Sequence, residues 1–438
     1  MMKSFIFAAF LSVIFAGETA SAIRWRPSFE NRLTLEPTYY FEDVYQETTQ
    51  VAAPIRYEFD LGLRPTRALR LRFSTWLFSD PATRSPNELF IPDVSEAAAD
   101  YQRGDWNLKV GINRFAWGVT DVANPLDVVS ARRYIDLLNS TKRGTPSVDL
   151  SWERDEWRLE AVFVPIQLES IMPGEKSRWL PRDLTYNRQV GLDKIFLAER
   201  FSYGYMEKRE VDDALKNNFG FRGDYRGPGF DLTAIFFQGA PTAPAIFTPI
   251  VDGTLISVDG GNVVMANHVT LQPVYYLRRT VGAGLVVPMD DWILRLAYAN
   301  SDRLSTLQGL PGWSQMMVAG VEKSFAAPMG STLLVLLQTS YAMHETQADN
   351  LITSLDRIFD RAWMLGLGLM TSSDWTFSAA GLYDAARSGG YAQLKIERKV
   401  TDGLTTAVTG DWIDGEAGTP LGTYRKNKRV LITTTAYF

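Results

Sequence analysis

Polar and apolar residues alternate strictly along this chain in segments of about ten residues, a pattern that few folds accommodate. Between Ile55 and Leu63 the odd positions hold Ile, Tyr, Phe and Leu, and the even positions hold Arg, Glu, Asp and Gly. Such alternation indicates a β-strand, whose successive side chains point to opposite faces. Strands of soluble sheets average about five or six residues, whereas a tilted strand needs about nine to eleven to cross a membrane. The segment lengths therefore favour membrane-spanning strands.

Alternating segments recur to the end of the chain, and tight turns and longer connections follow one another between them. Short turns at one end and long loops at the other are typical of outer-membrane barrels, with the short turns in the periplasm. We therefore predict an all-β fold, a transmembrane antiparallel up-and-down β-barrel of about 18 strands, or 16–18 given uncertain boundaries. The predicted strands are 29–41, 52–64, 69–78, 94–102, 105–115, 146–153, 156–165, 217–225, 230–238, 269–287, 291–299, 314–325, 331–341, 358–371, 374–383, 391–400, 404–412 and 427–438.

Both ends of the sequence carry signals of export and assembly. Lys3, a short apolar run and the small residues Ala20 and Ala22 predict a cleaved signal peptide over 1–22, which leaves a single barrel over 23–438. The chain has no cysteine, so disulfides do not stabilise it. Its last residue, Phe438, ends a strand that resembles the signal read by the barrel-assembly machinery, which we expect as a partner.

Four predicted strands leave a short turn with an acidic residue followed by tryptophan. In the predicted topology the four rings lie at one level, at the periplasmic interface. A girdle of interfacial tryptophans is typical of barrels, because the ring is apolar while its N–H requires water or a headgroup. We therefore expect outer-membrane lipid and lipopolysaccharide as partners, and a girdle of Trp106, Trp157, Trp292 and Trp375.

The strand phase that turns Leu, Val, Tyr and Trp towards lipid turns many charged residues inward. A charge at the bilayer midplane costs about 2–4 kcal/mol for Arg or Lys, so these side chains must face water in a channel. Arg56, Arg70 and Arg72 could form a basic ladder for anions. Alternatively they form wall salt bridges with acids such as Glu58 and Asp60, which only shape the interior.

One segment after the fifth predicted strand carries a recognisable motif. Trp117-Gly118, Asp121, Asn124-Pro125 and Asp127 follow the pattern WG-x2-D-x2-NP-x-D. The stretch from Lys109 to Pro146 resembles outer-membrane barrels of the DUF1302-like type and, more loosely, other porin and export barrels. The resemblance implies that 116–145 folds inward and narrows the channel.

The residues of this segment suggest how such a constriction would form. Gly118 allows a sharp turn, and Asn124-Pro125 is expected to begin a short helix with Asp127 in its first turn. Asp121 and Asp127 would then face Arg132 and Arg133 across the channel. A surface loop capped by a helix is the alternative.

Composition and motifs exclude several functions. A formal net charge of −5 argues against nucleic-acid binding, and no phosphate loop, dinucleotide fingerprint or metal motif is present. The two histidines, His268 and His344, lack the neighbours of a hydrolase, so we expect no enzyme, no cofactor and no metal. The favoured function is a porin-like channel for small hydrophilic solutes in the outer membrane of a Gram-negative bacterium. Alternatives are an export barrel for a polymer or lipid working with periplasmic partners, and a structural or adhesive barrel filled by 166–216. A homo-oligomer is possible, and the solute and direction of transport stay open.

Overall fold

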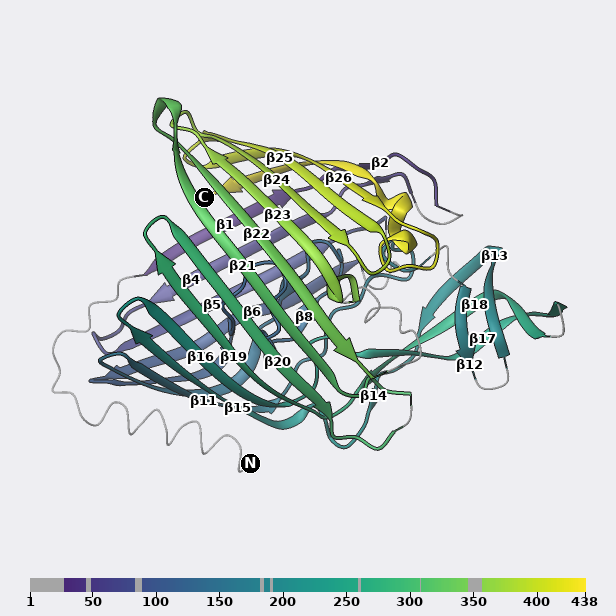
Figure 1. Ribbon diagram of the computed structural model, residues 1–438, viewed down its shortest axis with the longest axis horizontal. Helices are drawn as coiled ribbons and strands as arrows, with labels where there is room; N and C mark the ends of the chain where they lie inside the picture. Colours follow the sequence, from purple (N-terminus) through teal and green to yellow (C-terminus); the bar gives the residue numbers. More distant parts are fainter. Residues whose placement is uncertain are drawn as a thin grey trace.

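The protein folds as a closed antiparallel barrel of eighteen strands (Figure 1). The computed structural model describes residues 27–44, 49–82, 89–181, 185–189, 192–258, 261–307, 309–345 and 357–438. The expected signal peptide lies outside these ranges. The wall consists of twenty segments: β1 Ser28–Leu35, β2 Thr38–Tyr40, β3 Val51–Ala52, β4 Ile55–Leu63, β5 Leu69–Ser79, β6 Phe90–Arg103, β7 Trp106–Asn113, β10 Thr145–Arg154, β11 Trp157–Ile166, β15 Lys216–Gly227, β16 Phe230–Gly239, β19 Arg278–Met289, β20 Trp292–Arg303, β21 Ser314–Ala327, β22 Ser331–His344, β23 Arg361–Met370, β24 Trp375–Asp384, β25 Gly389–Thr401, β26 Leu404–Asp414 and β27 Arg429–Tyr437.

Two of the eighteen strands are each interrupted by a proline. Segments β1 and β2 both pair with β27 and are separated at Pro37, while β3 and β4 pair with β2 and β1 and are separated at Pro54. Proline lacks the N–H that a ladder requires, so the assigned strand breaks there while the direction of the wall continues. The eighteen strands match the eighteen predicted segments in number, and most bounds agree within about four residues, whereas the predicted segment 269–287 begins well before the observed strand, which starts at Arg278.

The barrel closes where the two ends of the chain meet. β1 pairs antiparallel with β27, and Asn31 and Phe438 exchange backbone hydrogen bonds of 3.0 and 3.1 Å. The Asn31 amide also donates to the Phe438 carbonyl at 3.0 Å and accepts from the Tyr57 hydroxyl at 2.7 Å. Closure leaves no unpaired edge in the barrel wall.

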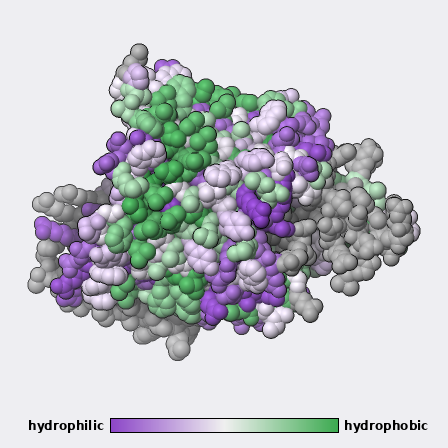
Figure 2. All heavy atoms as spheres, in the orientation of Figure 1, coloured by the Kyte–Doolittle hydropathy of each residue, from purple (hydrophilic) through white to green (hydrophobic). Residues whose placement is uncertain are grey.

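The outer face carries the apolar half of each alternating strand. Exposed side chains such as Phe163, Phe221, Leu296, Leu365 and Leu394 all point outward. Figure 2 shows a green, hydrophobic band that crosses the strands, with hydrophilic side chains towards both ends. An apolar face between two polar ends is what a barrel needs in a bilayer.

Tight turns join neighbouring strands at one end of the barrel, the short-turn end. Asp155, Asp290 and Asp374 adopt positive φ values of 53°, 51° and 62° in three of these turns, and Gly104 adopts 59° in another. Asp tolerates the left-handed region better than most residues do. Asp374 comes directly before Trp375, whereas Asp155 and Asp290 stand two positions before Trp157 and Trp292, so the turn conformation accounts for the acid directly before the ring only at Trp375. Longer connections lie at the opposite end, the long-loop end.

Short elements complete the described residues. A ribbon of β8 (Arg132–Arg133) and β9 (Thr141–Lys142) lies in the connection after β7, and three 3₁₀ turns are present, η2 (Pro328–Gly330), η3 (Arg357–Phe359) and η4 (Gly422–Asn427). Among the described residues, no helix has the length and hydropathy to cross a membrane.

The predicted strand 269–287 is wrong, because its first residues belong to a second sheet. This sheet contains β12 (Thr185–Gln189), β13 (Leu192–Tyr205), β14 (Arg209–Glu210), β17 (Ala245–Val258) and β18 (Gly261–Tyr275), and it projects beyond the barrel at the long-loop end (Figure 1). The chain returns to the barrel wall only at Arg278. Tyr275 and Tyr276 are both buried, which breaks the alternation at this junction. A period of two cannot by itself distinguish a barrel strand from a strand of another sheet.

We expect the seam between β1 and β27 to limit the stability of the barrel. Replacing Asn31 by Ala removes two side-chain hydrogen bonds, which should lower the free energy of unfolding by about 1–2 kcal/mol. The measurement is the temperature at which the compact form of the detergent-solubilised protein converts to the slower, unfolded form on gels.

The control is Thr434→Ala, at a position on β27 whose hydroxyl makes no hydrogen bond among the described residues. It should leave that temperature unchanged. Equal shifts in both variants, or a protein whose mobility does not respond to heat, would contradict this account of the seam.

Candidate functional site

The connection between β7 and β10, residues 114–144, lies inside the barrel and is called the inward loop below. Its backbone reaches the far wall, where the Gln338 amide of β22 donates to the Ala123 carbonyl at 3.0 Å and accepts from the Val122 N–H at 3.2 Å. Trp117 Nε1 donates to Glu160 on β11 at 3.0 Å. Gln338, Glu160 and Trp117 are all buried. The inward loop therefore spans the interior from β7 to β22.

The Trp-Gly and Asn-Pro parts of the motif pack on each other. Gly118 has a φ of 134°, and a Cβ at this position would meet the Asn124 side chain. The Asn124 amide in turn donates to the Trp117 carbonyl at 3.4 Å. The expected helix after Asn124-Pro125 is wrong, because the chain makes one turn closed by Asp127 N–H to Asn124 carbonyl at 3.4 Å. The β-branched Val128 and Val129 come directly after this turn, and such residues favour extended backbone.

The inward loop packs on three inward-facing glycines of the wall, Gly220, Gly282 and Gly284, which are called the glycine floor below. Cβ atoms at Gly282 and Gly284 of β19 would meet Leu126 and Val119, and one at Gly220 of β15 would meet Trp117. Leu126, Val129 and Trp117 form one buried cluster with Ala297 and Ala299 of β20. Glycine and alanine at these inward positions leave the space that the loop fills, so the loop is held against one side of the barrel.

A buried ion pair fixes the other end of the inward loop. Arg133 donates to Asp93 of β6 at 2.8 Å and to Ser95 at 2.9 Å, and Arg143 donates to Asp93 at 2.6 Å. The Arg133 guanidinium also covers the Trp76 ring, 4.5 Å from its centroid. Burial lowers the pKa of Arg133 from its usual value, and Asp93 opposes that shift. Arg133 therefore anchors the loop to the wall.

The four residues predicted to form the constriction, Asp121, Asp127, Arg132 and Arg133, belong to the inward loop. Their charged partners differ from those predicted. Asp127 binds Arg132 at 3.1 Å and Lys142 at 2.7 Å, both within the same loop. Asp121 lies 3.5 Å from Arg295 on the wall of β20. These four residues therefore do not place opposite charges across a gap, because Asp127 and Asp121 are each paired with a basic residue close by.

The basic ladder is not formed, and the alternative of wall salt bridges holds for Arg56, Arg72 and Glu58, while among the described residues Arg70 and Asp60 form no ion pair. Arg56 is the register neighbour of Phe78, whereas Arg72 is the neighbour of Gly62 on the same pair of strands, six positions nearer the short-turn end. Arg56 lies 3.6 Å from both Glu36 and Glu58, and Arg72 lies 3.4 Å from Glu96. Arg70 is the register neighbour of Asp100, and Asp60 that of Glu30.

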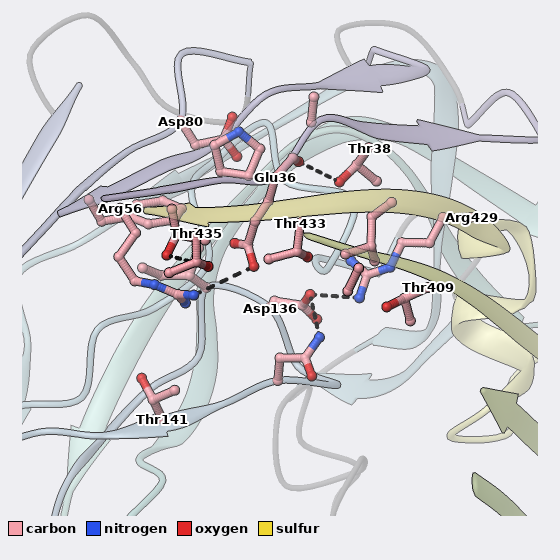
Figure 3. A pocket seen from close by; sticks show the side chains of 18 of the residues that line it. Glu36, Thr38, Arg56, Asp80, Asp136, Thr141, Thr409, Arg429, Thr433 and Thr435 are labelled. Atoms are coloured by element: carbon pink, nitrogen blue, oxygen red, sulfur yellow. Dashed lines mark hydrogen bonds and ion pairs between the residues drawn. The ribbon is translucent and has the colours of Figure 1, made fainter. Parts of the chain in front are cut away.

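A polar cavity of about 530 Å³ remains on the side of the barrel opposite the glycine floor. Its wall, called the seam wall below, consists of β25, β26 and β27 together with β1 to β5. Along β27 the lining residues run from Arg429, near the long-loop end, to Tyr437, near the short-turn end. Figure 3 shows Glu36, Arg56, Thr433 and Thr435 of this wall around the cavity.

The inward loop approaches the seam wall at Asp136 and Asn139. Asp136 binds Arg429 at 2.7 Å and accepts from the Asn139 amide at 3.3 Å (Figure 3). Arg429 is buried and also donates to Asp411 at 2.7 Å. The sequence analysis missed Asp136, because its partner lies almost three hundred residues away and no local pattern links them.

A second segment, residues 167–181, narrows the long-loop end of the cavity and is called the mouth segment below. Arg178 donates to the carbonyls of Glu42 and Lys426 at 2.7 and 2.8 Å and to the Asn427 side chain at 3.3 Å. Trp179 packs on Tyr424, with ring centroids 5.7 Å apart. Part of the predicted filling by 166–216 is therefore present, while β12, β13 and β14 lie in the projecting sheet.

The four predicted girdle tryptophans each begin a strand at the short-turn end. Trp106, Trp157 and Trp292 are about half exposed on the outer face, and Trp375 stacks on Phe377 beneath the Arg398 guanidinium. A second group of exposed aromatic side chains lies towards the long-loop end, namely Tyr39, Tyr341, Trp363, Tyr383 and Trp412.

Comparison with known proteins supports the fold and leaves the family open. No protein-family model matches the sequence, and no curated protein matches it. OpdO of Pseudomonas aeruginosa has a TM-score of 0.50 at 11% identity, over 94% of this chain and 96% of that chain. OccAB2 of Acinetobacter baumannii gives 0.49 at 11% over 94% and 98%, and OmpT, an outer membrane protein of Vibrio cholerae, gives 0.42 at 10% over 97% and 100%. At these identities the likeness to OpdO shows the barrel fold alone, and the DUF1302-like resemblance stays a prediction.

We expect Asp93 to hold the inward loop in place. Asp93→Asn keeps the size of the side chain but leaves two arginines without their carboxylate. Removing one partner of a buried ion pair costs about 3–5 kcal/mol, so the barrel should unfold at a clearly lower temperature. The measurement is thermal unfolding in detergent.

Glu96→Gln on the same strand is the matched control, because its partner Arg72 is nearly half exposed and such pairs contribute about 1 kcal/mol or less. If both variants lose the same stability, Asp93 is not the anchor described above.

Proposed function

We propose that the protein is an outer-membrane channel through which small hydrophilic solutes diffuse along the seam wall. The observation that carries this proposal is the polar cavity between the seam wall and the inward loop, which extends along the length of β27. A wide barrel encloses more space than its own side chains fill, and the remaining space is aqueous. The inward loop narrows that space and leaves the passage on one side.

The outer surface supports the proposed location. The apolar band has exposed aromatic side chains towards both of its ends, as expected where a barrel crosses two membrane interfaces. On this proposal the short-turn end and both chain ends face the periplasm, and Phe438 closes the strand that the barrel-assembly machinery reads. Lipid and lipopolysaccharide would then contact the outer face.

Two other functions predict different electrical behaviour. An export barrel would conduct only with its periplasmic partner, and a structural or adhesive barrel would have a filled interior. The mouth segment fills part of the barrel interior at the long-loop end. Between that segment and the short-turn end, the cavity along the seam wall stays open. Open single-channel steps of the purified protein in a planar bilayer favour the channel, whereas silence without a partner favours the alternatives.

We predict that ion selectivity depends on the pair formed by Arg56 and Glu36, whose side chains lie 3.6 Å apart at the cavity. Fields are focused in a narrow passage with low-dielectric walls, so one unbalanced charge has a large effect there. Arg56→Gln should shift the reversal potential in a KCl gradient towards cations, and Glu36→Gln should shift it towards anions.

The control variant is Arg154→Gln, which removes a charge from an exposed pair with Asp155 at the short-turn end. It should leave the reversal potential close to that of the unmodified protein. Channels that conduct but show the same selectivity in all three variants would place the ion pathway elsewhere in the barrel.

A further inference from the structure

We propose that the seam wall selects neutral polyhydroxylated solutes, such as small sugars and polyols, over ions of similar size. This inference rests on the proposed channel function and names the class of solute that the cavity takes. It is carried by two features of the wall, its rows of threonine hydroxyls and the pairing of its charges.

Threonine hydroxyls line the cavity in register across neighbouring strands. Thr405 of β26, Thr435 of β27 and Thr34 of β1 are direct register neighbours, and the Thr34 and Thr435 hydroxyls are 3.2 Å apart. Nearer the long-loop end, Thr409 and Thr38 flank Leu431 in the same manner. All five threonines line the cavity. Thr34, Thr38, Thr409 and Thr435 are buried in the wall, and the Thr38 hydroxyl donates to the Glu36 carbonyl at 2.9 Å. The hydroxyls at the surface of the passage are those of the half-buried Thr405 and, at the next level, Thr433.

Thr433 lies between these two rows and faces the cavity in Figure 3. Its register neighbour is Ala407, another lining residue, so a small apolar surface adjoins its hydroxyl. A sugar presents hydroxyls at its edge and C–H groups on its faces. The alternation of Thr, Ala and Leu on this wall matches that mixture.

Five of the seven basic residues that line the cavity are paired with carboxylates, and the other two, Lys176 and Arg178, lie in the mouth segment. Seven basic and four acidic residues line the cavity, which would suggest an anion channel if they were free. Arg56, Lys395 and Arg429 bind the lining acids Glu36, Glu397 and Asp136, however. Carboxylates directly behind the lining bind the cations as well: Arg32 binds Glu58 at 2.8 Å, Arg133 binds Asp93 at 2.8 Å and Arg429 binds Asp411 at 2.7 Å. The field along the seam wall is therefore weak for a lining so rich in charged groups.

These two features favour a neutral polar solute by elementary chemistry. An ion that gives up part of its hydration shell requires a strong opposite field, which paired charges do not supply. A hydroxyl can both donate and accept, so a row of threonines can replace the water around a sugar hydroxyl in many orientations. Each such bond is weak, and a ladder of weak sites allows a solute to enter and to leave.

The experiment measures block of the single-channel ion current by glucose, by the anion gluconate and by the cation glucosamine. These solutes are similar in size and differ in charge. We expect glucose to block with a lower apparent dissociation constant than either ion. Equal or stronger block by gluconate or glucosamine, in channels that conduct, overturns the inference and leaves the channel function standing, whereas absence of conductance overturns both.

Variants of the wall test the hydroxyls directly. Thr433→Val keeps the shape and removes the hydroxyl, and it should raise the dissociation constant for glucose about fivefold, the factor expected for one neutral hydrogen bond. Thr433→Ser should keep the affinity, and Thr434→Val, one position along β27 and facing outward, should not change it. An unchanged affinity in a folded, conducting Thr433→Val channel contradicts the role of the hydroxyl rows.

Discussion

Backbone hydrogen bonding between β1 and β27 is the constraint on which the rest of the structure depends. A strand surrounded by lipid has no water to satisfy its N–H and C=O groups, so the wall must close on itself. The two strands that close it come from opposite ends of the chain, and Asn31 joins them with its side chain as well as its backbone. Pro37 and Pro54 interrupt the neighbouring ladders only near the long-loop end.

Closure with eighteen strands creates a second constraint, which is the width of the interior. Wall side chains cannot fill a ring of this size, so further chain must enter it to form a passage of molecular dimensions. The inward loop does so because one side of the wall carries Gly220, Gly282 and Gly284 where other strands carry large side chains. Apolar contacts hold the loop on that floor, while Asp93 and Gln338 bind its two ends. The position of the cavity follows from the position of these small residues.

The sequence was sufficient to predict the strands of the barrel wall, but it was insufficient to predict the contacts inside the barrel. Alternation over about ten residues depends only on the two environments of a wall strand, so it predicted the number of strands without any knowledge of their partners. It failed for 269–287, because the first part of this segment belongs to β18, a strand of the second sheet that also has two different faces. The contacts that shape the cavity join residues far apart, such as Asp136 with Arg429 and Arg178 with Asn427, and no local spacing reports them. Gly118 has the positive φ that the expected turn would use, whereas the helix after Asn124-Pro125 was predicted wrongly, because a helix depends on the residues after the motif.

The pairing that closes the barrel consequently also completes the wall of the proposed passage. The glycine floor, the inward loop and the wall residues that hold the loop, Asp93 and Gln338, all lie in the part of the sequence from β6 to β22. The seam wall requires β1 to β5 from the beginning of the chain and β25 to β27 from its end, and the inward loop binds it through Arg429 on the last strand. The cavity thus has no complete wall until β27 pairs with β1. Because the threonine rows cross that same seam, a barrel that failed to close would lose both its membrane-compatible edge and the surface along which we propose that the solute moves.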